Sequence, residues 1–146
     1  MNDFIPLFTR ASKLMRGAAD AAFSRHGVRV GQNLLLEQLW EEDGLTPGEI
    51  AQQLGVSTPT VVKMATRMEG GGFLERRPDE RDARLVRLYL TDLGRSVREP
   101  LERELEQLRQ QATAHLTAAE CREFEAALAK MVDNLESIER IEPDER

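Results

Sequence analysis

Apolar residues recur at helical spacing over the first part of the chain. From residue ~3 to residue ~25 they fall three or four positions apart, which predicts one long amphipathic helix ended by His26-Gly27. A second helix is predicted over residues ~31–43, where leucines and Trp40 recur before Gly44. These two helices precede the part of the chain with the clearest local signals.

The middle of the chain carries the boundary signals of two short helices joined by a tight turn. Thr46 is followed by Pro47 and Glu49, which is the pattern of an N-cap, a first-turn proline and a capping box. Gly55 stands where a left-handed residue is expected to end this helix. Because Ser57 can cap the next helix almost at once, the pattern predicts a helix-turn-helix.

The second of these helices, predicted over residues ~58–69, has two different sides. Its apolar stripe consists of Val61, Met64, Ala65 and Met68. The opposite side carries Pro59, Val62, Lys63, Thr66 and Arg67. Short side chains near the start and long cations further along suit a helix that enters a DNA major groove N-terminus first.

A β-hairpin is predicted after Gly70-Gly71-Gly72. Its two strands are Phe73–Arg77 and Arg84–Leu90, the second with alternating apolar residues, and the polar turn PDERDA joins them. Thr91 can cap a following helix over residues ~92–114, which Pro100 should kink or divide.

The last helix is predicted to begin at a second capping box, LTAAE, and to carry a heptad seam. The seam consists of Cys121, Phe124, Leu128, Met131, Leu135 and Ile138. A seam longer than two heptads indicates packing against another helix. The tail IEPDER is expected to fray. The element order predicts a mainly α (α+β) fold.

Charge is distributed unevenly along the chain. The formal net charge is −6, yet from Ser57 to Arg87 seven basic residues face five acidic ones. Affinity for DNA depends on the surface that touches phosphate rather than on the whole-chain sum. The single cysteine, Cys121, allows no disulfide within the chain. With no apolar run of ~20 residues and no signal-like start in MNDFIPLFTR, a cytoplasmic protein is expected.

The segment from Leu45 to Gly94 resembles winged-helix regulators of the multiple-antibiotic-resistance regulator (MarR) family. It reads LTPGEIAQQLGVSTPTVVKMATRMEGGGFLERRPDERDARLVRLYLTDLG, and the order and spacing of its short motifs carry the resemblance. The resemblance implies a winged helix-turn-helix domain over 29–91 and helical dimerisation regions over 1–28 and 92–146. Each protomer of a homodimer would then place a recognition helix in a major groove and a wing over the adjacent minor groove of a pseudo-palindromic operator.

The resemblance also assigns roles to single residues. The expected DNA contacts of the recognition helix are Ser57, Thr58, Pro59, Thr60, Val62, Lys63 and Arg67. In the wing, Arg81 would enter the minor groove, and Arg76 or Arg77 would meet phosphates. Asp79 would brace the wing by pairing with an arginine such as Arg84, which is itself a candidate DNA contact. The expected dimer contacts are Phe4, Leu7, Phe8, Leu14, Phe124, Leu128, Met131 and Leu135. Repression is the family's default action and activation is the alternative.

Several other readings stay open at this stage. The hairpin can be an ordinary solvated loop, the winged helix can be a protein-interaction adaptor, and DNA binding can be independent of sequence. Relatives that release DNA on binding a phenolic or other aromatic acid make Leu14, Met15 and Trp40 candidate effector contacts, although Trp40 also fits a simple core role.

The remaining candidates for chemistry are isolated residues. Cys121 is either a redox-sensing thiol or a structural cysteine on the apolar seam. His26 and His115 fall at predicted helix ends without the spacing of metal ligands, so no metal or other cofactor is predicted. No glycine-rich loop lies between a strand and a helix, and the chain is not expected to be an enzyme.

Overall fold

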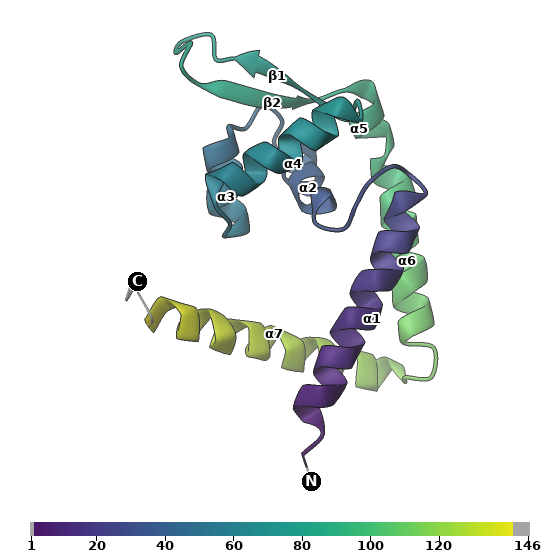
Figure 1. Cartoon of the computed structure of the whole chain (residues 1–146). Helices are drawn as coiled ribbons and strands as arrows, with labels where there is room; N and C mark the ends of the chain where they lie inside the picture. The colour runs from purple at the N-terminus through teal and green to yellow at the C-terminus, as the bar shows by residue number, and fades with distance from the viewer. Residues whose placement is uncertain (1, 142–146) are drawn as a thin grey trace. The chain divides into compact units, whose positions relative to one another are not determined.

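The computed structural model describes residues 2–141, which form seven helices and two strands among those residues. The helices are α1 Phe4–Ser24, α2 Gln32–Glu41, α3 Pro47–Leu54, α4 Thr58–Gly70, α5 Asp92–Ser96, α6 Arg98–Ala112 and α7 Ala118–Ile141. The strands are β1 Leu74–Pro78 and β2 Val86–Leu90 (Figure 1). The predicted mainly α (α+β) class is therefore correct. Most of the tail IEPDER lies outside the described residues.

The chain divides into two compact units, Met1–Leu108 and Arg109–Arg146. This boundary falls inside α6. It is defined by contacts within one chain, whereas the boundaries predicted from the resemblance separate DNA binding from dimerisation. The functional division at residues 28/29 and 91/92 therefore stays a prediction. None of the described helices combines the length and the apolar character needed to cross a bilayer.

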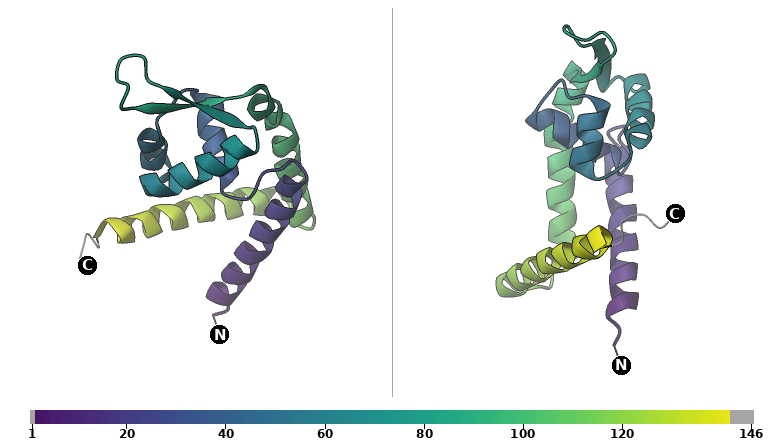
Figure 2. Two further views of the ribbon diagram at one scale, coloured as in Figure 1. Left: turned by 45° about the horizontal axis from the view of Figure 1, so that its top comes forward. Right: turned by 90° about the vertical axis from the view of Figure 1, so that its left-hand side faces the viewer.

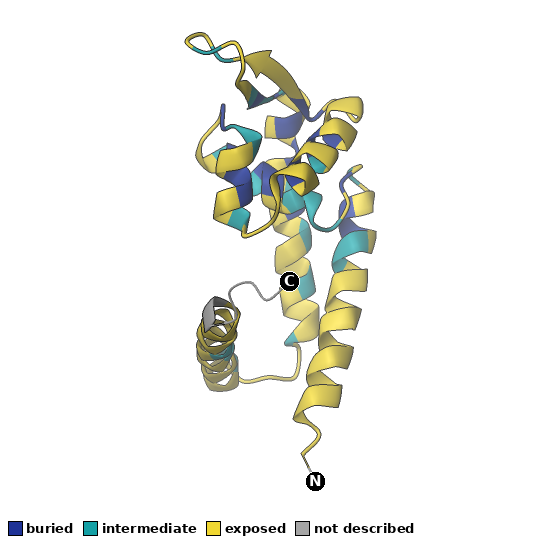
Figure 3. Cartoon of the chain, turned by 60° about the vertical axis from the view of Figure 1, so that its left-hand side comes forward, coloured by how far each residue is buried: buried dark blue, intermediate teal, exposed yellow. Residues whose placement is uncertain are grey.

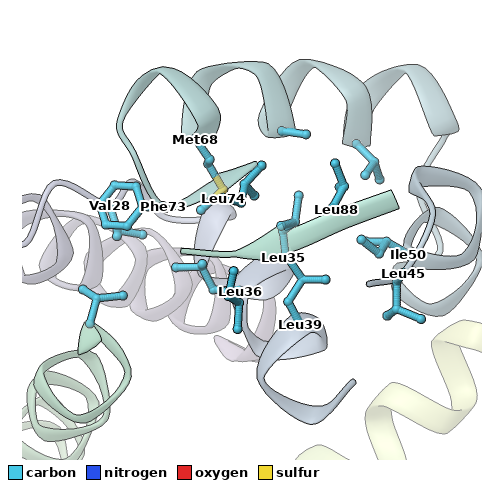
Figure 4. Close-up of a cluster of buried hydrophobic side chains, with 14 of the residues drawn as sticks. Val28, Leu35, Leu36, Leu39, Leu45, Ile50, Met68, Phe73, Leu74 and Leu88 are labelled. Atoms are coloured by element: carbon cyan, nitrogen blue, oxygen red, sulfur yellow. The ribbon is translucent and has the colours of Figure 1, made fainter. Parts of the chain in front are cut away.

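One apolar core holds the first unit together. The apolar stripes of α2, α3 and α4 meet the inner faces of the two strands, as the labelled side chains in Figure 4 show. Its fully buried side chains include Leu35, Leu36, Leu39, Ile50, Val61, Met68, Leu74 and Leu88. In α4, Val61, Ala65 and Met68 are buried and Met64 is partly buried against them, so the predicted stripe is confirmed.

The predicted helix boundaries of the helix-turn-helix are also confirmed. The Thr46 hydroxyl accepts a hydrogen bond from the amide of Glu49 (3.2 Å), and the Ser57 hydroxyl accepts one from the amide of Thr60 (3.3 Å). Gly55 ends α3 in the left-handed conformation, with φ +67°. The left-handed conformation is energetically unfavourable for any residue with a Cβ atom. Glycine therefore allows the tight turn that connects α3 to α4.

The two strands form an antiparallel hairpin, the wing. Its register pairs Leu74 with Leu90 and Pro78 with Val86. The predicted strands needed small corrections, because β1 begins and ends one residue later than predicted and β2 begins at Val86 rather than at Arg84. A further bridge joins Leu45 to Leu88, through the Leu88 amide and the Leu45 carbonyl (2.9 Å), and so fastens the wing to the segment before α3.

The helix predicted over residues ~92–114 is divided, as Pro100 suggested, but the division lies before the proline. The short α5 ends at Ser96 and α6 begins at Arg98, so Pro100 occupies the first turn of α6. A proline is tolerated there because the first-turn amides have no intrahelical acceptor.

Helices α1 and α7 expose most of their apolar residues. Only Ala22 and Phe23, at the end of α1, are buried, and no described side chain of α7 is buried (Figure 3). The capping of α7 is as predicted, since the Thr117 hydroxyl accepts a hydrogen bond from the amide of Glu120 (3.1 Å). Its seam residues Cys121, Leu128 and Met131 are half-buried, whereas Phe124 and Leu135 are exposed.

Candidate nucleic-acid interface

The outer side of α4 is a solvent-facing surface of short side chains and two cations. Burying Val61, Ala65 and Met68 turns the opposite side of the helix outward, and all seven predicted contact residues on it are exposed. They are Ser57, Thr58, Pro59, Thr60, Val62, Lys63 and Arg67. Ser57 and Thr60 share a hydrogen bond between their hydroxyls (2.8 Å), which fixes the polar groups at the start of the helix.

The wing extends from the helices beside α4 (Figures 1 and 2). Its first strand, β1, contains Arg76 and Arg77. Successive side chains of a strand point to opposite faces, so Arg76 and Arg77 point in opposite directions. Arg76 and Arg77, which were predicted as alternative phosphate contacts, therefore lie on different faces of the wing.

Arg76 joins the wing to α4. Its Nη2 donates to the Thr66 hydroxyl (2.6 Å) and approaches the Val62 carbonyl (3.4 Å), while its Nε lies 3.4 Å from a Glu69 carboxylate oxygen. Three groups of α4 thus hold one guanidinium of β1. This geometry fixes the angle between the helix and the wing, a role that its place in the sequence did not reveal.

Arg77 belongs to the other face of the wing. It forms an ion pair with Glu75, and its guanidinium stacks 4.4 Å from the centre of the Tyr89 ring. The hydrogen bond to Glu75 raises the pKa of Arg77 above its ordinary value. With 57% of its side chain exposed, Arg77 remains accessible to a polyanion.

Asp79 braces the loop at the end of the wing, as predicted, but its partner is Arg87 and not Arg84. One carboxylate oxygen accepts the amides of Arg81 (2.8 Å) and Asp82 (2.9 Å), and the other accepts the Arg87 Nε (2.5 Å). The bond from Arg87 and then those two amides lower the pKa of Asp79 to about 2. Arg84 instead pairs with Asp82 (3.0 Å).

Arg87 is the site residue that the sequence did not single out. Besides Asp79, it reaches the Gly44 carbonyl (2.9 Å) and lies 3.9 Å from Glu49 at the start of α3. It therefore ties the wing to the helix-turn-helix from the second strand. The alternation of β2 could have identified it, because Arg87 is the charged residue on the polar face between Val86 and Leu88.

The loop of the wing leaves two arginines at the surface. Arg81 is exposed, and the Arg84 side chain is 90% exposed although Asp82 holds it. The Asp79 carboxylate accepts hydrogen bonds from the backbone amides of Arg81 and Asp82, and these bonds order the loop that carries both arginines. An ordered hairpin with exposed arginines beside an exposed helix surface offers two adjacent elements that could each contact a groove of a DNA duplex.

The other predicted candidates lie apart from this surface. Trp40 lines a cavity of the first unit and donates its indole N–H to the Gly94 carbonyl (2.8 Å), whereas Leu14 and Met15 are exposed on α1 and do not line that cavity. His26 lies 3.0 Å from Glu104, and His115 is exposed between α6 and α7. Within residues 2–141 no three His, Cys, Asp or Glu side chains gather as metal ligands would.

The chain is similar in sequence to known proteins. Residues 30–86 match the family model described as "MarR family". The chain is 25% identical over 136 residues to YybA of Bacillus subtilis, an uncharacterized HTH-type transcriptional regulator, and the match covers 93% of this chain and 91% of that protein.

Solved structures of similar fold include complexes with DNA. The S. aureus MepR–DNA complex superposes with a TM-score of 0.80 at 26% identity, covering 92% of this chain and 99% of that one. A mutant of E. coli MarR complexed with operator DNA gives a TM-score of 0.76 at 25% identity, covering 86% and 91% of the two chains.

Proposed function

We propose that the chain, whose residues 30–86 match the MarR family model, is a transcriptional regulator that binds a specific DNA sequence as a homodimer. The observation that carries the proposal is the pairing of two surfaces on one compact unit. The outer side of α4 presents Ser57, Thr60 and Lys63, and the wing presents Arg81 at an ordered loop. Similarity to two proteins solved with DNA supports the same function.

In the proposed complex, α4 lies in the major groove and the wing loop lies over the minor groove. The hydroxyls at the start of α4 and the methyl groups of Val62 would contact base edges, because a thymine methyl favours apolar contact. Lys63 and Arg67 lie further along the helix, where they would meet phosphates. Arg81 would enter the minor groove, whose negative potential is strongest where the groove is narrow and rich in A·T pairs.

The proposed homodimer explains the exposed apolar residues at the two ends of the chain. Phe4, Leu7 and Leu14 of α1 are 50%, 64% and 62% exposed, and Phe124 and Leu135 of α7 are 55% and 52% exposed. Stripes of this kind on long helices indicate helix packing against a second copy. Two-fold symmetry would then set two half-sites about one helical turn, ~34 Å, apart. Light scattering should give the mass of a dimer, and Leu135→Asp should lower it.

We infer repression as the mode of action, since a dimer seated over a promoter blocks access to it, and a small-molecule effector as the means of release. An effector acts if it binds better to the conformation that cannot bind DNA. The cavity beside Trp40 is the site we assign to it, because Trp40 bonds to Gly94 directly after the wing.

Binding to DNA from upstream of the chain's own gene, compared with a shuffled duplex over a range of salt concentrations, tests the function. We expect tight binding to the upstream duplex alone, with log affinity falling linearly as log salt rises. Arg81→Ala should weaken binding and reduce the slope by about two, one for each protomer. The control Arg103→Ala removes the same charge from the exposed side of α6 and should change neither.

Three other results would each change a different part of the proposal. Equal affinity for both duplexes would indicate a sequence-independent DNA binder or an operator elsewhere. No binding at low salt would favour a protein-interaction adaptor. If Arg81→Ala and Arg103→Ala behave alike, the assignment of the wing to the minor groove is wrong.

A further inference from the structure

The cavity beside Trp40 is lined by apolar and acidic side chains. Its volume is about 320 Å³, close to the lower end of the range for small-ligand pockets, roughly 300–1,000 Å³. Leu105 of α6, 40% exposed, supplies apolar surface, and Trp40 supplies an aromatic ring from α2. Phe23 of α1 and Leu101 of α6 also line the cavity but are almost fully buried. All lining residues belong to the first unit, so one protomer builds the whole cavity.

A guanidinium already occupies the position where a bound organic cation would be stabilised. The Arg98 Cζ lies 5.7 Å from the centre of the Trp40 ring, within the distance at which a cation is attracted to an aromatic face. Its Nε donates to a Glu102 carboxylate oxygen (2.9 Å), and its Nη2 lies 3.6 Å from Glu41. The cavity thus binds one planar cation through a ring and two carboxylates.

Arg98 does not neutralise this lining. Glu37 adds a third carboxylate, which accepts a hydrogen bond from the Asn33 amide (3.3 Å). Three glutamates against one arginine leave the lining with a net negative charge. Solvent reaches these groups, since the side chains of Arg98, Glu102 and Glu41 are 44%, 56% and 80% exposed. An anionic ligand would meet repulsion here, and a cationic one would be attracted.

We propose that this cavity binds a small organic cation that carries one aromatic ring. The ring would lie on the apolar surface beside Trp40, and the charged group would lie among Glu37, Glu41 and Glu102 and displace the Arg98 guanidinium. The assignment rests on the proposed function for its meaning as an effector site, but the binding itself requires no DNA. It differs from the aromatic acid that the family resemblance suggested, because the charge of the lining has the opposite sign to that needed for an acid.

Three probes of similar size and different charge test the proposal on the full-length protein without DNA. They are benzyltrimethylammonium, benzyl alcohol and phenylacetate. Trp40 is the only tryptophan of the chain, so its fluorescence reports on the cavity directly. We expect a saturable change in emission with the cation, at an affinity on the order of tenfold higher than that of the alcohol, and the weakest response with phenylacetate.

Charge-neutralising variants identify the groups responsible. Glu37→Gln should weaken binding of the cation several-fold and leave benzyl alcohol unchanged, because the alcohol has no charge to stabilise. Arg98→Gln removes the resident cation and should strengthen binding of benzyltrimethylammonium. The matched control Glu99→Gln removes a carboxylate from the same helix as Arg98, outside the cavity lining, and should leave all three affinities as they are.

Each contrary result overturns the assignment. Phenylacetate binding as tightly as the cation, a weaker cation affinity in Arg98→Gln, or equal effects of Glu37→Gln and Glu99→Gln would each do so. No saturable change with any probe would mean that the cavity is not a ligand site. DNA binding measured separately keeps the two proposals apart, because a protein that binds the cation but no DNA contradicts only the proposed function.

Discussion

Replacing Gly94 with alanine should destabilise the first unit although it places a better helix former in α5. A Cβ atom built on Gly94 would lie 2.0 Å from the Phe73 carbonyl oxygen and 3.1 Å from the Leu90 Cδ2. The oxygen is backbone and already accepts the Thr91 amide (3.1 Å), so it cannot rotate away as the end of a long side chain can. To reach even 3.0 Å, the start of the wing and α5 must separate by about 1 Å.

The size of the effect follows from two opposing contributions. Overpacking costs about 1–3 kcal/mol, and a clash with fixed backbone belongs at the upper end of that range. Alanine recovers about 1 kcal/mol of helix propensity. The expected net loss is about 2 kcal/mol of the free energy of unfolding. For a chain of this length, that lowers the melting temperature by roughly 4–8 °C.

Thermal unfolding followed by circular dichroism and by Trp40 emission measures this change at fixed protein concentration. Emission is informative because the Trp40 indole donates to the Gly94 carbonyl, which must move with α5. The matched control is Gly48→Ala in α3, where an added Cβ meets only the Thr46 Oγ1, at 4.0 Å. We expect its melting temperature to stay level or to rise. A melting temperature of Gly94→Ala equal to or above that of the parent protein would refute the reasoning.

Three further predictions concern the wing. Arg76→Ala should weaken specific DNA binding several-fold because Arg76 bonds to α4. The slope of log affinity against log salt should stay the same. A slope lowered by about two would mean that Arg76 contacts phosphate in each protomer. Asp79→Asn should lower the free energy of unfolding at pH 7, and the effect of the substitution should fade in acid. The pKa of Asp79 falls to about 2 on folding. The stabilisation by Asp79 is therefore present above pH ~4 and is lost as pH falls toward 2. Urea unfolding at pH 7, 4 and 3 checks this, and an equal effect at all three would contradict it. Leu88→Ala should cost about 2–5 kcal/mol of unfolding free energy because Leu88 is fully buried. The control Leu85→Ala, at a residue that is 43% exposed, should change the unfolding free energy by less than about 0.5 kcal/mol. Similar losses for the two variants in urea unfolding would show that burial does not decide the outcome.

Features set by neighbours in the sequence could be predicted correctly. Thr46, Gly55 and Ser57 act within four residues of their own positions, so their side chains and backbone angles determine helix ends without help from the rest of the fold. The buried side of α4 follows in the same way from helical period alone. The glycine of the motif LTDLG has a further reason, since α5 approaches the Phe73 carbonyl too closely for any larger residue.

The partners of charged side chains could not be predicted, because they depend on strand register and on contacts between elements. Asp79 faces Leu85 across the hairpin, and its diagonal neighbour on the same face is Arg87, so the nearer Arg84 is left to pair with Asp82. Whether Arg76 faces α4 or solvent depends likewise on which face of β1 packs on that helix. Sequence spacing contains neither piece of information.

The closed hydrogen-bond pattern of the wing loop makes it a replaceable module. The Asp79 amide donates to the Leu85 carbonyl (2.9 Å), and the Leu85 amide donates to the Asp82 carbonyl (3.0 Å). The Asp79 carboxylate also accepts hydrogen bonds from two amides of its own loop. Positions such as Glu80, Arg81 and Arg84 can therefore vary while the frame around them persists. Natural drift or a designed library could exchange them and change the proposed groove contacts without refolding the domain.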